Sequence, residues 1–180
     1  MKNNINISGL SEYVHEVLDC PTQAKVNYGV EVDWLSGTKT KATVKNMNLG
    51  DQKLVRNFTF EIDEPNQLLG LNTNPTPQEY LMAGVAGCMA VTFVAGATLL
   101  GITIESLKIE IEGQLDLCGF LGLESTQPTG FKEFTCNIHV NGNGTKEQYE
   151  VLRNRVMNHS PNFSSLVSGV KMNPEIIIKT

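Results

Sequence analysis

Apolar and polar residues alternate in the first third of the chain. The alternating segments are residues 26–34, 41–47 and 53–63. In the last of them Phe58, Phe60 and Ile62 are separated by polar residues, a period of two that places one row of side chains on each face of a β-strand. Turn-forming sequences at 35–38 and 48–51 separate the segments. The pattern predicts an antiparallel meander of three strands with one face in water.

The longest apolar segment predicts a helix with sharply defined ends. It opens with TPQE at 76–79, the order of a capping box in which Thr76 caps the first turn and Glu79 reaches back. We expect the helix to continue to about Leu100 and to stop at Gly101, which tolerates a left-handed backbone. Because apolar or small residues cover every side of this helix, we expect protein to surround it.

The same segment is long enough to cross a membrane, because no charged residue occurs between Tyr80 and Ile104. However, it contains several glycines and lacks the basic flanking residues that orient a spanning helix. The sequence therefore favours a core helix, and we expect no membrane partner.

Further elements follow the same rules of periodicity and capping. We predict helices at 8–19, 145–157 and 161–168, and strands at 107–117, 131–140 and 175–179. This order indicates an α+β fold with an antiparallel sheet around a buried helix. We expect an N-terminal helical extension over residues 1–22 and one domain over residues 23–180.

Charge and cysteine content restrict the possible partners. The 14 basic and 19 acidic residues give a net charge of −5, which disfavours binding to nucleic acid. The four cysteines have neither the spacing of a zinc site nor that of a small disulfide framework, so we expect no metal. The N-terminus has no apolar signal-like segment, and we expect a cytoplasmic protein with reduced thiols. Cys136 alternates with apolar residues, which predicts a core position.

Three groups of residues resemble the OsmC/Ohr family of osmotically inducible and organic hydroperoxide resistance proteins. They are DEPNQLLGLNTNPTPQEYLMAGVAGCMA (63–90), LDLCGFLGL (115–123) with PTGF (128–131), and NHSP (158–161). The resemblance implies an intertwined homodimer in which curved antiparallel sheets wrap long central helices. It also implies active sites at the subunit interface, and we expect no cofactor.

The resemblance implies a reaction centred on sulfur. In the family's peroxidases a cysteine of the central helix attacks the O–O bond of an organic hydroperoxide and becomes a sulfenic acid. A second cysteine condenses with it, and an external dithiol restores the pair. The attacking species is the thiolate, which the family holds with a paired arginine and glutamate.

Carried over to this chain, the resemblance makes Cys88 the peroxidatic cysteine, with Gln78 at the position of the family's glutamate. The candidate cations are Lys39 and Lys41 near the first hairpin turn and Arg56 on the third strand. A lysine supplies charge without the forked geometry of arginine.

The second cysteine of the family is replaced by Ser160, which precedes Pro161. Cys118 stands where the LDLCGFLGL motif usually has arginine, so a resolving role for Cys118 is conceivable. An apolar pocket would be lined by residues of the central helix, namely Leu81, Met82 and Met89.

Two functions remain open at this point. The first is a thiol peroxidase for organic hydroperoxides. The second is a non-catalytic dimer that binds a small hydrophobic molecule or serves as a scaffold, which the replacements at Gln78 and Ser160 favour.

Overall fold

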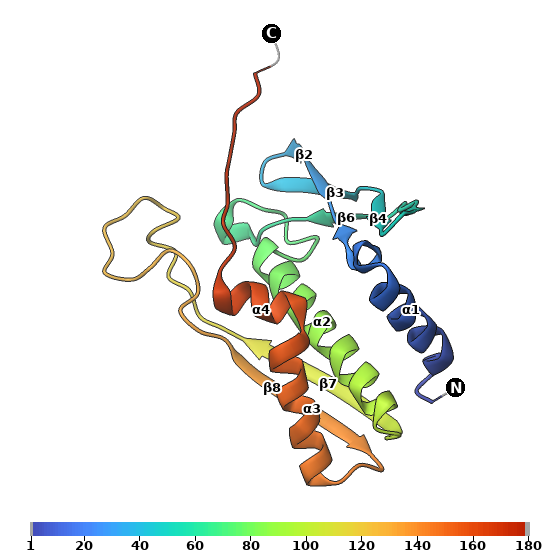
Figure 1. The fold of residues 1–180 in the computed structure, drawn as a ribbon. Coiled ribbons are helices and arrows are strands. Elements are labelled where there is room, and N and C mark those ends of the chain that lie inside the picture. Colours follow the sequence, from blue (N-terminus) through green and yellow to red (C-terminus); the bar gives the residue numbers. More distant parts are fainter. Residues whose placement is uncertain (1, 179–180) are drawn as a thin grey trace. The chain divides into compact units, whose positions relative to one another are not determined.

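The computed structural model describes residues 2–178, and their contacts fall into two compact units (Figure 1). The N-terminal unit extends to Ala83, and the C-terminal unit begins at Gly84, within the long helix α2 (Pro77–Leu99). Each unit has its own sheets, and all strand pairs are antiparallel. The expected mixture of helices and antiparallel sheets is therefore confirmed.

The N-terminal unit contains helix α1, two short 3₁₀ helices and six strands. The elements are α1 (Ile7–Asp19), η1 (Pro21–Ala24), β1 (Val26–Asn27), β2 (Val30–Ser36), β3 (Lys39–Val44), β4 (Met47–Leu49), β5 (Gln52–Leu54), β6 (Thr59–Ile62) and η2 (Asn66–Leu68). The predicted turns are present, with Gly37 and Gly50 in the left-handed region.

The single meander is wrong, because the strands form two sheets with the orders β1-β4-β5 and β2-β3-β6. Each of the three predicted strands is broken in two: residues 26–34 divide into β1 and β2, residues 41–47 into β3 and β4, and residues 53–63 into β5 and β6. Two of these breaks contact each other. The amide of Arg56, between β5 and β6, donates to the side chain of Asn46, between β3 and β4, at 2.8 Å, so this amide bonds outside the strand ladders. Every residue of β2 is exposed, including Trp34 at 70%, so this strand has no covered face.

Helix α2 begins and ends as the sequence predicts. The Glu79 carboxylate accepts from the Thr76 amide at 2.7 Å, and the Glu79 amide donates to the Thr76 hydroxyl at 3.3 Å. At the other end Gly101 has φ +72°, the left-handed stop. Among the described residues, α2 alone is long and apolar enough to span a bilayer by length and composition.

The prediction that protein surrounds α2 on every side is wrong for a single chain. Phe93 is fully buried, whereas Val91 on the same helix is 70% exposed. Val85, Met89, Phe93 and Ala97 recur at helical spacing and form one buried stripe. One side of α2 therefore faces the core of this chain, and another apolar side is uncovered.

The C-terminal unit packs this stripe against helix α3 (Lys146–His159) and the hairpin of β7 (Ile104–Glu112) and β8 (Thr135–Gly142) (Figure 1). Leu152 and Val156 of α3 are fully buried in this core. Gly96 allows the close approach, since an added Cβ there would lie 2.9 Å from Leu152 Cδ2 and 2.6 Å from Arg155 Cδ. Thr145 and Gln148 form the predicted capping box at the start of α3.

Several predicted boundaries shift in this unit. The strand predicted at 107–117 runs from Ile104 to Glu112, where its pairing with β8 ends, and the Asp116 carboxylate accepts from the Cys118 amide at 2.7 Å in the loop that follows. Its partner, predicted from residue 131, begins at Thr135. Helix α4 (Pro161–Ser168) has the predicted bounds.

The C-terminal segment is extended but forms no strand within the described residues. Ile176, Ile177 and Ile178 are 91%, 85% and 80% exposed. The strand predicted at 175–179 is therefore absent over residues 175–178, and Lys179 lies outside the described residues.

Candidate functional site

The Cys88 sulfur lies beside a buried hydroxyl at the junction of α3 and α4. Ser160 Oγ donates a hydrogen bond to Cys88 Sγ at 3.3 Å. Ser160 is fully buried, and Cys88 is half-buried. The two residues are 72 positions apart in sequence, so the packing of α3 and α4 against α2 brings them together.

Both flanking helices hold Ser160 in place. Its amide donates to the Val156 carbonyl at 3.0 Å and ends α3. Its own carbonyl accepts from the Ser164 amide at 2.9 Å in the first turn of α4, which Pro161 opens. These two bonds fix the backbone of Ser160 at the junction, from which its buried side chain reaches Cys88.

A second contact fixes the same junction on α2. Asn162 Nδ2 donates to the Gly84 carbonyl at 2.9 Å, one helical turn before Cys88. Gly84 and Cys88 each precede a residue of the buried stripe by one position, which is a rotation of about 100° around the helix. Cys88 thus faces the α3–α4 junction, while the neighbouring Met89 faces the core.

A hydroxyl that donates to sulfur has a definite chemical effect. Ser160 supplies a hydrogen-bond donor to the sulfur of Cys88, and such bonds are stronger when the acceptor is ionised.

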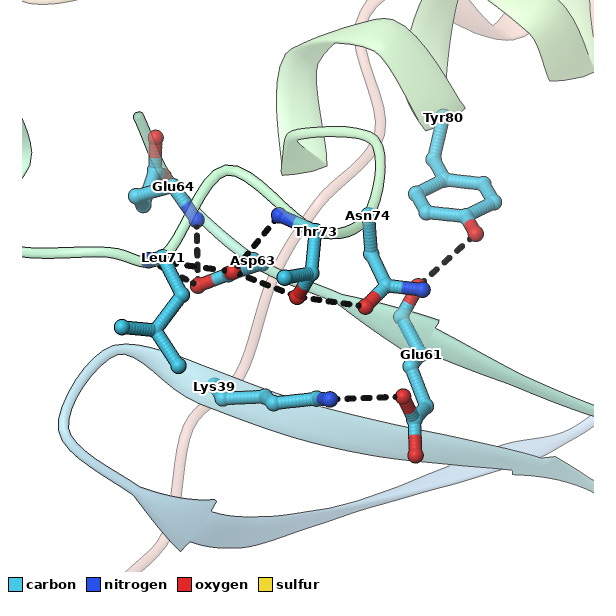
Figure 2. A network of polar contacts seen from close by, with 8 residues as sticks. All are labelled: Lys39, Glu61, Asp63, Glu64, Leu71, Thr73, Asn74 and Tyr80. Atoms are coloured by element: carbon cyan, nitrogen blue, oxygen red, sulfur yellow. Dashed lines mark hydrogen bonds and ion pairs between the residues drawn. The ribbon is translucent and has the colours of Figure 1, made fainter. Parts of the chain in front are cut away.

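The three predicted cations belong to the N-terminal unit. Lys39 forms an ion pair with Glu61 at 2.8 Å (Figure 2), and Lys41 is exposed. The Arg56 guanidinium lies over the Phe58 ring, 4.6 Å from its centroid. Arg56 Nε is buried and has no hydrogen-bond partner among the described residues. Which cation serves Cys88 stays a prediction.

The other predicted residues lie on α2. Gln78 is half-buried in the first turn, while its neighbour Glu79 caps the helix. Leu81 is exposed, Met82 is half-buried, and Met89 is buried in the core.

The loop before α2 contains an organising group that the sequence analysis missed, the fully buried Asp63 (Figure 2). Its carboxylate accepts from the amides of Glu64, Leu71 and Thr73 at 2.9, 3.2 and 3.1 Å, and from the Thr73 hydroxyl at 2.9 Å. These bonds, foremost that from the Thr73 amide, lower the pKa of Asp63 to about 2. An acidic residue directly after a strand and before a loop rich in Asn and Thr was the available signal.

Tyr80 anchors the first turn of α2 within the N-terminal unit. Its hydroxyl donates to the Glu61 carbonyl at 2.8 Å (Figure 2). Its ring also packs 4.7 Å from that of Phe60. Asp63 and Tyr80 together fix where the helix that carries Cys88 begins.

The remaining thiols each have a different neighbour, and all four cysteines are free. A hydrogen bond to Asp116, together with burial, raises the pKa of the Cys118 thiol. Cys136 Sγ lies 4.0 Å from Met89 Sδ. Cys136 is exposed, so its predicted core position is wrong for the single chain. Cys20 contacts the Thr22 hydroxyl at 3.1 Å.

A cavity of about 890 Å³ lies in the loop after β7. Its lining comes from residues 112–135, including Glu112, Asp116 and Lys132, and does not include Cys88. The cavity therefore does not mark the thiol site.

The fold and the thiol–hydroxyl pair define a class of mixed helix-and-sheet proteins, with open antiparallel sheets and a cysteine on a long apolar helix. The sequence model of the OsmC-like proteins matches residues 70–175, more than half of the chain. The chain belongs to the OsmC-like protein family. A search of curated protein sequences gives no match.

Solved structures support the same fold. An OsmC-like protein from Mycoplasma pneumoniae is 18% identical with a TM-score of 0.59, over 78% of this chain and 87% of that chain. An OsmC-like protein of unknown function from Vibrio cholerae is 14% identical with a TM-score of 0.60, over 77% and 92%. An organic hydroperoxide resistance protein from Elizabethkingia anophelis is 16% identical with a TM-score of 0.52, over 77% and 86%.

Proposed function

We propose that this chain is a thiol peroxidase that reduces small organic hydroperoxides at Cys88. The observation that carries the proposal is the buried Ser160 hydroxyl, which lies 3.3 Å from the Cys88 sulfur and places a hydrogen-bond donor beside the reacting atom. Family membership supports it, as does the fold shared with a protein named for organic hydroperoxide resistance.

The reaction moves one oxygen atom. The Cys88 thiolate attacks an oxygen of the hydroperoxide, an S–O bond forms and the O–O bond breaks. The organic fragment leaves as an alkoxide and takes up a proton to become an alcohol. Cys88 is oxidised to a sulfenic acid, which an external dithiol reduces in the cytoplasm. Leu81 and Met82 on the same helix would contact the apolar part of the substrate.

A cation from the N-terminal unit, of the same or a second subunit, would complete the site. Arg56 is the strongest of the three candidates, because a buried guanidinium donor without a partner is costly and gains most from an anionic acceptor. Lys39 is already paired with Glu61. Gln78 at the position of the family's glutamate leaves the cation without that carboxylate.

The active form is a homodimer with intertwined subunits. Three apolar features support this: the exposed side of α2 at Val91, the exposed strand β2, and the exposed isoleucines of the C-terminal segment. A second copy would surround α2, making it the central helix of the dimer, and would pair the extended C-terminal segment.

The test is consumption of cumene hydroperoxide with a dithiol as reductant. Cys88→Ser should abolish it, while Cys20→Ser, which changes an exposed thiol, should retain the wild-type rate. An unchanged rate in Cys88→Ser would end the proposal and leave the alternative, a non-catalytic dimer that binds a small hydrophobic molecule or serves as a scaffold.

A further inference from the structure

We infer that Cys88 operates without a resolving cysteine: its sulfenic acid is held by Ser160 and is reduced directly by an external thiol. The inference rests on the proposed peroxidase function and specifies how the oxidised site is restored. It starts from the group that lies next to the sulfur. That group is a hydroxyl, which hydrogen-bonds sulfur but forms no disulfide.

The other thiols of the chain are engaged elsewhere. Cys136 contacts Met89, which is rotated by about 100° around α2 from Cys88. The Cys118 thiol is hydrogen-bonded to Asp116, and this bond, with burial, raises its pKa, which disfavours the nucleophilic thiolate. Cys20 contacts Thr22. A disulfide requires Cα atoms within about 7 Å and aligned Cβ atoms, and Cys88 aims at Ser160 instead.

Ser160 suits the role of a positioning residue for the oxidised state. It is fully buried, and its backbone is hydrogen-bonded to both flanking helices, which places its oxygen beside the sulfur. As a donor it would hydrogen-bond the sulfenate that forms on this sulfur. Cys88 is half-buried, which leaves access for a small thiol.

The restoring steps balance with thiols alone. A thiol RSH attacks the sulfenic acid of Cys88, an S–S bond forms and water leaves. A second thiol attacks the resulting mixed disulfide, which releases Cys88 as a thiol and RSSR as product. The two external thiols lose the two electrons that reduced the hydroperoxide. A dithiol supplies both sulfurs from one molecule, and two monothiols serve equally.

The experiment is intact-mass analysis of the full chain after one equivalent of cumene hydroperoxide, without reductant. The inference expects a gain of one oxygen that is located on Cys88 and trapped by dimedone. Adding a monothiol should then convert this species to a mixed disulfide. Loss of two hydrogens in the wild-type protein, or a linkage between two chains, would overturn the inference and leave the peroxidase function standing. No reaction at Cys88 would overturn both.

Two variants at Ser160 sharpen the test. S160C places a second sulfur beside Cys88, and we expect it to lose two hydrogens and form a bridge instead of gaining oxygen. S160A removes the donor and should slow oxidation of Cys88 on the order of ten-fold, while the product keeps its added oxygen. If S160C also stops at the sulfenic acid, Ser160 does not lie beside the reacting sulfur and the inference is wrong.

A further test compares the rate of hydroperoxide consumption with a monothiol and with a dithiol as the reductant, at equal thiol concentration. Comparable rates for the wild-type protein support direct reduction by any small thiol. Turnover with the dithiol alone would overturn the inference that any small thiol restores Cys88, and would leave the peroxidase function standing. Turnover with neither would overturn the inference.

Discussion

Leu152→Ala tests whether the packing of α3 on α2 is what holds Ser160 against Cys88. Leu152 is fully buried in the core and meets α2 where Gly96 allows close approach. The substitution removes Cγ and both Cδ atoms, which costs roughly 2.4 kcal/mol at about 0.8 kcal/mol per methylene. The cavity left behind raises the expected loss in free energy of unfolding to about 3 kcal/mol.

The assay is urea unfolding at a fixed protein concentration, because the stability of a dimer depends on concentration. Val151→Ala is the matched control, since Val151 is the preceding residue of α3 and is 56% exposed. Its loss should remain within about 0.5 kcal/mol. A second readout is the rate at which iodoacetamide alkylates Cys88 in the folded protein. Leu152→Ala should raise that rate, because Ser160 caps the C-terminal end of α3 and looser packing of α3 would move Ser160 away from Cys88.

The reasoning is refuted if both variants lose the same stability, or if Leu152→Ala loses less than about 1 kcal/mol. A large loss of stability with an unchanged alkylation rate would show that the packing of Leu152 does not control access to Cys88. In that case α4 and its Asn162–Gly84 contact, rather than α3, would hold the hydroxyl in place.

Two further predictions concern the loop before α2 and the uncovered side of α2. Since the pKa of Asp63 is lowered from 3.8 to about 2, its contribution to stability is present above about pH 4 and is lost as the pH falls toward 2. Asp63→Asn should therefore lower the melting temperature at pH 6, and the difference from wild type should shrink at pH 2; a constant difference would contradict this. Val91→Asp should shift light-scattering mass from dimer to monomer, whereas Val151→Asp should not; an intact dimer would exclude this side of α2 from the interface.

Features that depend on neighbouring residues could be predicted from the sequence. The capping boxes at Thr76 and Thr145 form because each needs only four consecutive residues. The left-handed stop at Gly101 is local for the same reason. Strand ends were less predictable, because they depend on the partner strand: alternation continues to Leu117, but β7 ends at Glu112, which pairs with the first residue of β8.

Contacts between residues far apart in sequence could not be predicted from periodicity or capping patterns. The proximity of Ser160 to Cys88 was implied only by the family resemblance, since no spacing rule connects residues 72 positions apart. Asp63 was missed because a buried carboxylate needs no charged partner when backbone amides satisfy it. Its role depends on how a loop folds back, which periodicity does not describe.

The overturned predictions about burial all err in the same direction, and this pattern is itself informative. Periodicity predicted more cover than one chain provides on α2, at Cys136 and on one face of the first predicted strand, which contains β2. Periodicity reports which side of an element needs to be dry, but not which chain covers it. Burial predicted at three places that one chain leaves exposed is what the proposed homodimer requires, because a second copy would cover these surfaces. In that homodimer, the second copy that surrounds α2 would also supply the remaining walls of the Cys88 site.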